Sequence, residues 1–239
     1  MRTRGSCRSV VVRIIHLVVC ALLFSGCGPR ATTPLTMAAA RGEVQELERL
    51  IAAGADPNSG GDSAFTPLIW AARQGEIAAV RRLVALGADP NRTSGVNDWS
   101  PVLHALHKQQ TKTALALIEL GATVNGRAGQ RALAMAVGYG NAEMTRALLA
   151  LQVDPHLHVG SGPSLLALAA AGAYDIDYRW SGCGPHTMTL RALVEHAPDL
   201  RLNDTVWDRY AIAYVRRRRC AEMLTLIEPR IAVRRAAAP

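Results

Sequence analysis

The chain repeats itself at intervals of about 33 residues, and this period constrains its fold more than any other feature. A hydroxyl residue, a proline and an aliphatic residue open the clearer copies, and weaker copies follow at steps of 31 and 33 residues. The copies are Thr33-Pro34-Leu35, Thr66-Pro67-Leu68, Ser100-Pro101-Val102, Arg131-Ala132-Leu133 and Ser164-Leu165-Leu166. A fixed period of this length predicts a row of similar units, in which each unit buries its apolar face against the next one.

Each unit is predicted to be a pair of short helices. Thr66 is suited to cap a helix, and Pro67 is suited to its first position. Gly75 predicts a sharp turn, after which apolar residues from Ile77 to Val84 recur at helical spacing. Gly87 is suited to end the second helix. It opens a second motif with the same period, whose copies are Gly54-Ala55-Asp56-Pro57-Asn58, Gly87-Ala88-Asp89-Pro90-Asn91, Gly121-Ala122-Thr123-Val124-Asn125 and Gln152-Val153-Asp154-Pro155-His156.

Together the two motifs resemble the ankyrin repeat, a unit of two antiparallel helices and a projecting loop. The resemblance covers about residues 33–200. It implies an all-α ankyrin-repeat solenoid of five to six helix-pair repeats with short projecting loops, in a domain that spans residues 33–229. The later copies decay, since Gln109-Gln110 replaces a turn glycine and Gln152 replaces a closing glycine.

Residues 1–26 are predicted to be an export signal. Arginines without any acid precede an apolar run, Ile14–Phe24, which is shorter than the roughly 20 residues that a membrane-spanning helix needs. Removal of this segment, with its four arginines, lowers the formal net charge from +8 to +4. The modest charge of an exported chain disfavours nucleic acid as a partner.

The end of this segment resembles the lipobox of bacterial lipoproteins, in the residues Leu23-Phe24-Ser25-Gly26-Cys27. The resemblance implies a lipoprotein signal peptide, lipidation of Cys27 and a tether over residues 27–32. Because Gly28 follows the cysteine where an inner-membrane protein would have aspartate, the implied location is the outer membrane, facing the periplasm. The alternative is an ordinary signal peptide with a chance cysteine.

Cys183 and Cys220 are predicted to form a disulfide, because an exported chain meets an oxidising compartment. Cys183 lies in a predicted insertion, residues 173–185, within the fifth repeat, which also holds Tyr174, Tyr178 and Trp180. Cys220 is placed at the matching turn of the sixth unit, and residues 230–239 are predicted to be a frayed tail. Neighbouring helices pack about 10 Å apart, so the two cysteines could approach bonding distance. The alternative is two unpaired cysteines.

The sequence predicts no enzyme, no cofactor and no metal site. His104 and His107 are three residues apart, but no third ligand stands at a recognisable spacing, so both are interpreted as solvated or packing histidines. No nucleophile elbow, phosphate-binding loop or zinc-protease motif is present. The run Arg216–Arg219 is interpreted as a solvated helix end, with acidic lipid or protein as its alternative contact.

The resemblance also implies where a protein partner would bind, because ankyrin repeats usually meet partners on their concave side. The implied residues are Asp62, Ser63, Phe65, Arg73, Gln74, Asn97, Trp99, His107, Lys108, Arg127, Gln130 and Tyr139. For Phe65 and Trp99, local packing is the alternative.

The function implied is a monomeric protein-binding module at a membrane. A toxin-neutralising immunity protein, a periplasmic scaffold and a stress-protection factor for a periplasmic enzyme are the roles left open. Two alternatives lie outside these roles: an enzyme with an unrecognised site in the insertion, and a surface protein that binds lipid or lipopolysaccharide.

Overall fold

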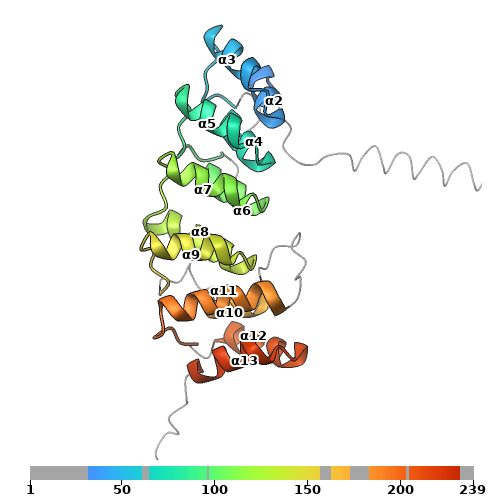
Figure 1. Ribbon diagram of the computed structural model, residues 1–239, viewed down its shortest axis with the longest axis vertical. Helices are drawn as coiled ribbons and strands as arrows, with labels where there is room; N and C mark the ends of the chain where they lie inside the picture. The colour runs from blue at the N-terminus through green and yellow to red at the C-terminus, as the bar shows by residue number, and fades with distance from the viewer. Residues whose placement is uncertain are drawn as a thin grey trace, which may run out of the picture.

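The computed structural model describes residues 32–60, 65–95, 97–156, 163–172, 183–202 and 205–231. These residues form twelve α-helices in six consecutive pairs, followed by a short 3-10 helix (Figure 1). The pairs are α2 (Pro34–Arg41) with α3 (Val44–Ala52), α4 (Pro67–Gln74) with α5 (Ile77–Ala85), α6 (Pro101–His107) with α7 (Thr111–Glu119), α8 (Gly126–Gly138) with α9 (Ala142–Ala150), α10 (Leu165–Ala171) with α11 (Cys183–His196), and α12 (Val206–Arg218) with α13 (Ala221–Ile227).

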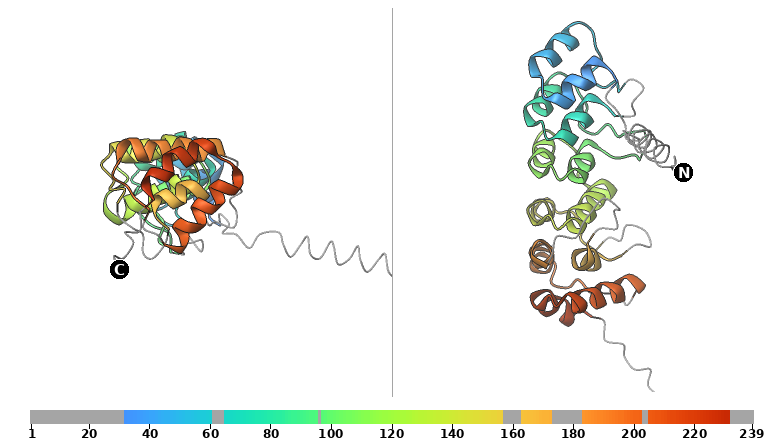
Figure 2. Two further views of the ribbon diagram at one scale, coloured as in Figure 1. Left: turned by 90° about the horizontal axis from the view of Figure 1, so that it is seen from below. Right: turned by 90° about the vertical axis from the view of Figure 1, so that its right-hand side faces the viewer.

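The pairs stack in chain order to form a solenoid. The first helices α2, α4, α6, α8, α10 and α12 pack side by side, and the second helices form a parallel row next to them (Figure 2). The core follows the stack and includes fully buried leucines in units far apart, such as Leu47, Leu83, Leu117 and Leu190. The predicted all-α repeat solenoid is therefore confirmed.

Local capping explains why the first helices begin and end where they do. In α4, Thr66 Oγ1 accepts a hydrogen bond from the Ile69 N–H (3.3 Å), and Pro67 fills the first helical position. Gly75 ends the helix with a φ of 84°, a left-handed conformation that glycine adopts at no steric cost. These features agree with the prediction made from the motif.

Asparagines of the projecting loops join each unit to the next. Asn91 Nδ2 donates to the Gly121 carbonyl (3.3 Å), and Asn91 Oδ1 accepts from the Thr123 N–H (2.6 Å). Asn58 makes the same two contacts one unit earlier, with Gly87 and Asp89. The repeated asparagine thus satisfies backbone groups that its neighbour leaves open at the end of a helix.

Two helix starts differ from the prediction, and two turns keep their geometry without glycine. Helix α8 begins at Gly126, five residues before the predicted start at Arg131, although two of the five added residues are glycines, and no proline marks a beginning at Arg131. Gln109 and Gln152 adopt φ values of 58° and 62°, so the turns keep the glycine geometry without glycine. Helix α11 begins at Cys183, so the last three residues of the predicted insertion are helical, and residues 173–182 lie outside the described ranges.

Close packing accounts for one glycine inside α8. A Cβ atom at Gly129 would lie 2.0 Å from the Val124 carbonyl oxygen and 3.1 Å from a methyl group of Val153. Only glycine lets the first turn of α8 approach the preceding loop so closely. The early start of this helix therefore depends on Gly129.

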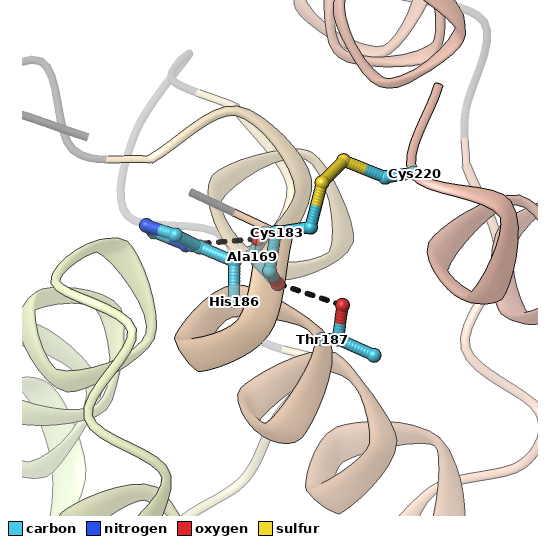
Figure 3. The surroundings of a disulfide bond; sticks show 5 residues. All are labelled: Ala169, Cys183, His186, Thr187 and Cys220. Carbon is cyan, nitrogen blue, oxygen red and sulfur yellow. Dashed lines mark hydrogen bonds between the residues drawn. A yellow bond between two sulfur atoms is a disulfide. The ribbon is translucent and has the colours of Figure 1, made fainter. Parts of the chain in front are cut away.

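A disulfide between Cys183 and Cys220 links the last two second helices (Figure 3). Cys183 is the first residue of α11, Cys220 immediately precedes α13, and their Cα atoms are 5.8 Å apart. His186, one turn into α11, donates from Nδ1 to the Ala169 carbonyl of α10 (3.1 Å). The disulfide thus links the sixth unit to α11, and α11 is itself hydrogen-bonded to α10.

We expect the purified protein to release no thiol from these two cysteines when it is denatured without reductant. The disulfide closes a loop of 37 residues of sequence separation, which in the loop-entropy description stabilises the fold by about 3–4 kcal/mol. Cys183→Ser with Cys220→Ser should lower the free energy of unfolding by this amount. Thermal unfolding followed by circular dichroism would detect the loss as a lower melting temperature. Two titratable thiols would show that the bond does not form.

Asn91→Ala should lower the free energy of unfolding by about 1–2 kcal/mol, because two hydrogen bonds between units are lost. Urea unfolding measures the change. Arg92→Ala alters the neighbouring exposed residue and is the control. Equal effects of the two variants would contradict the role assigned to Asn91.

Candidate functional site

Side chains from three consecutive units contact one another in a continuous row beside the first helices. Arg73 lies over the Phe65 ring, 5.0 Å from its centroid, and its Nη1 lies 3.1 Å from His104 Nδ1. The ring of Trp99 packs edge-on against both His104 and His107, at centroid distances of 5.5 Å and 5.3 Å. We call this series, completed by Tyr139, the aromatic–histidine cluster, and its members are Phe65, Arg73, Trp99, His104, His107 and Tyr139.

The last contact of the cluster reaches the fourth unit. His107 Nδ1 lies 3.0 Å from the Tyr139 hydroxyl, and Tyr139 caps the C-terminus of α8. Five of the predicted partner-binding residues therefore lie in one contiguous cluster. The sixth member, His104, was predicted to be a solvated or packing histidine rather than a metal ligand, and its buried ring packs against Phe65 and Trp99.

The cluster has a buried base and a half-exposed rim. Phe65 is only 4% exposed and His104 is fully buried. Phe65 therefore offers almost no surface to a partner, and the local-packing alternative describes it correctly. Arg73, Trp99, His107 and Tyr139 are half-buried, and Gln74 and Lys108 beside them are exposed.

Burial keeps His104 neutral. Desolvation, and to a lesser degree the charges of Arg73, His107 and Lys108, lower the pKa of His104 to about 3. Because a guanidinium can only donate, Arg73 donates to His104 Nδ1, and the proton of the neutral ring lies on Nε2. His104 therefore acts as an acceptor that fixes the direction of the Arg73 side chain.

Asn97 shapes the loop that presents Trp99. Its Oδ1 accepts hydrogen bonds from Ser94 Oγ (2.5 Å) and from the Trp99 N–H (3.2 Å). Arg131 of α8 reaches the Asn97 carbonyl at 3.5 Å. The side chain of Asn97 is thus engaged within its own loop, and its role is to position Trp99.

The remaining predicted residues fall into two groups. Arg127 and Gln130 lie in the first turns of α8 and not on a projecting loop, because that helix begins early; Arg127 is exposed and Gln130 is half-buried. Asp62, Ser63 and Cys27 lie outside the described residues.

The charged residues of the first helices that are not buried are all positive. The single acid of these helices, Asp208, is fully buried and accepts hydrogen bonds from Ser164 Oγ (2.6 Å) and Thr205 Oγ1 (2.8 Å). Exposed acids lie on the second helices, in turns and in loops, and several pair with arginines there. The cationic residues of the first helices are Arg41, Arg73, Arg127, Arg131, Arg209, Arg216, Arg217 and Arg218.

We call the row formed by α2, α4, α6, α8, α10 and α12, with its exposed side chains, the first-helix face. It combines a half-buried arginine, an indole and a phenol with a surplus of positive charge. Within the part of the chain that the structure describes, no three potential metal ligands come together. In the same ranges, no helix has the length and apolar composition needed to cross a bilayer.

The register of the repeats gives a second signal that His104 is buried. This histidine stands four residues after the capping Ser100, as Trp70 stands four residues after Thr66. Because Trp70 belongs to the core, this register predicts a buried ring at His104. The contacts of Asn97 carry no comparable signal, since they depend on the shape of one loop.

A family model described as ankyrin repeats (3 copies) matches residues 12–94. The match includes the loops and helices of the first two described units, and it begins within the segment predicted to be a signal peptide. A search of curated proteins gives no significant match. Ankyrin repeats are therefore found within residues 12–94.

The stability of the protein should fall as the pH drops below about 6.5. Burial lowers the pKa of His104 to about 3 and that of His186 to about 4. The unfolded chain, with ordinary histidine pKa values, therefore binds more protons than the folded chain between about pH 6.5 and pH 4. Each histidine should contribute a loss of about 1.4 kcal/mol per pH unit in that window.

Urea unfolding at several pH values measures this slope. His104→Gln should reduce it by the share of one histidine. An unchanged slope in the His104 variant would contradict the neutral, buried state assigned to that ring.

Proposed function

Because the chain is an all-α solenoid of ankyrin repeats, we propose that it binds an acidic surface of a protein partner through its first-helix face. Ankyrin repeats are generally protein–protein interaction modules and are typically non-enzymatic. The choice of an acidic partner is supported by one observation. The charged residues of the first helices that are not buried lie on α2, α4, α8 and α12 and are all arginines, while the second helices carry both signs.

The aromatic–histidine cluster is the proposed centre of the contact. Tryptophan, tyrosine and arginine are the residue types that contribute most to binding energy at protein interfaces. Trp99 is held by two histidine rings, and Arg73 is held by Phe65 and His104. Side chains fixed before binding lose less conformational entropy when the partner arrives.

Burial supports the role of Arg73 in recognising a carboxylate. Desolvation lowers the pKa of Arg73 from its ordinary value, so its charge is poorly solvated in the free protein. His104 accepts one hydrogen bond but, being neutral, does not balance this charge. A carboxylate of the partner would supply the missing counter-charge with a charge-assisted hydrogen bond.

We further propose that the protein is exported and attached to the outer membrane, facing the periplasm, by a lipid at Cys27. This rests on the basic start, the short apolar run and the lipobox-like residues before Cys27. The tether of residues 27–32 could extend about 20 Å at most. The N-terminal unit would then lie near the bilayer, and the binding face would serve a toxin-neutralising or scaffolding role in the periplasm.

Capture of a partner from the envelope fraction of the native host tests the proposal. Trp99→Ala should weaken capture about 30-fold, because truncation of an interface tryptophan costs about 2 kcal/mol or more. Arg73→Gln should weaken it about tenfold and should reduce its sensitivity to salt.

Arg81→Gln is the matched control, since Arg81 is an exposed arginine on a second helix. It should leave capture unchanged. Capture that is equally weakened by all three variants, or by none, would show that the partner binds elsewhere. A captured partner without an acidic surface would contradict the charge argument.

A further inference from the structure

The last first helix, α12, exposes apolar side chains that a terminal unit would normally replace by polar ones. Val206 is 71% exposed, Tyr210 is 51% exposed and Trp207 is 38% exposed. The opposite side of the helix is buried through Asp208, Ala211 and Val215. This exposed surface, in the first two turns of α12, calls for an explanation beyond packing.

The aromatic residues continue along one stripe of the helix and end at an arginine. Trp207, Tyr210, Tyr214 and Arg218 follow one another at spacings of three, four and four residues, which places them on one side of a helix. Tyr210 stacks on Tyr214 at 6.0 Å, and Arg218 lies over the Tyr214 ring at 5.3 Å. We call Val206, Trp207, Tyr210, Tyr214, Arg217 and Arg218 the α12 stripe.

The charge around the stripe is strongly positive. Arg209 and Arg216–Arg219 are exposed, and the only acid of α12, Asp208, is buried. Arg216 lies 3.6 Å from Glu228. Residues 205–231 hold six arginines and three acids, so their formal net charge is 6 − 3 = +3. A second copy of this chain is therefore a poor occupant, because it would bring two arginine runs together.

We propose that the α12 stripe docks on an anionic lipid surface. Tryptophan and tyrosine rings are favoured at the level of lipid headgroups, where their apolar bodies and polar tips are both accommodated. Arginines reach headgroup phosphates while their methylene stems cover apolar surface. Val206 inserts beside the rings, and the arginines at the other end of the helix supply the attraction to negative charge.

The position of α12 makes this geometry possible. It lies at the end of the stack opposite α2 and α3, and no further helix pair follows α13 in the described residues (Figures 1 and 2). A flat, extended surface can approach a terminal helix without meeting the loops of another unit. The stripe is separate from the aromatic–histidine cluster, which lies in the second to fourth units.

Quenching of Trp207 fluorescence by vesicles tests the proposal with the full chain. The vesicles consist of phosphatidylcholine with or without phosphatidylglycerol, and each contains a lipid with a quencher at headgroup depth. The signal of Trp207 is the difference between the wild-type chain and Trp207→Phe. We expect this signal to be quenched on the anionic vesicles and restored by added salt, and to be unchanged on the neutral ones.

Arg217→Gln with Arg218→Gln should lower the docking equilibrium constant about 25-fold, because each arginine near an anionic surface contributes about a fivefold factor. Arg217→Lys with Arg218→Lys keeps the charge and should dock nearly as well, which separates loss of charge from loss of folding. Arg81→Gln with Arg146→Gln removes the same charge from second helices and is the matched control, expected to dock normally.

Three results would overturn the proposal: equal quenching on neutral vesicles, no quenching on anionic vesicles, or unchanged docking of the glutamine variant. Shielding of Trp207 by a captured acidic protein, without quenching on vesicles, would assign the stripe to a protein instead. Trp99→Ala should dock normally on vesicles, so a failure here is distinguishable from a failure of the proposed partner binding.

Discussion

No helix pair in this protein can bury its own apolar face, and every other structural feature depends on that constraint. The leucines of one unit are covered by the helices of the units on either side. The asparagine contacts have the same dependence, since Asn58 and Asn91 each bond to the backbone of the following unit. Functional side chains from different units, such as Arg73 and His104, meet only because this stacking fixes the distance between units.

Much of the fold was predictable because its signals are local. A capping hydroxyl, a following proline and a turn glycine, as in Thr66, Pro67 and Gly75, act within one helix and can be recognised without the rest of the chain. The early start of α8 was not predictable in the same way, because its first turn carries no such marker and depends on the contact of Gly129 with Val124. The left-handed turn at Gln109 was hidden too, since the stack imposes a conformation that the residue itself does not favour.

The sequence predicted most of the residues of the candidate site, but it did not predict how they contact one another. The register of the repeats placed Arg73, Trp99 and Tyr139 on one face, and the structure brings them together. It also shows that Phe65 and His104 are the base on which they rest, a distinction that depends on contacts between residues about thirty positions apart. The single sign of charge along the first helices was present in the sequence but became visible only when the helix boundaries were known.

A solenoid held by contacts between neighbours melts most readily from its ends, because a terminal unit has only one neighbour to lose. The Cys183–Cys220 disulfide changes this at one end only. The bond keeps the start of α13 attached to the start of α11, so a covalent link opposes separation of the last two units. The opposite end has no such crosslink among the described residues. Under pulling or proteolysis, the stack should therefore unfold from α2 and α3 toward the end that the disulfide crosslinks.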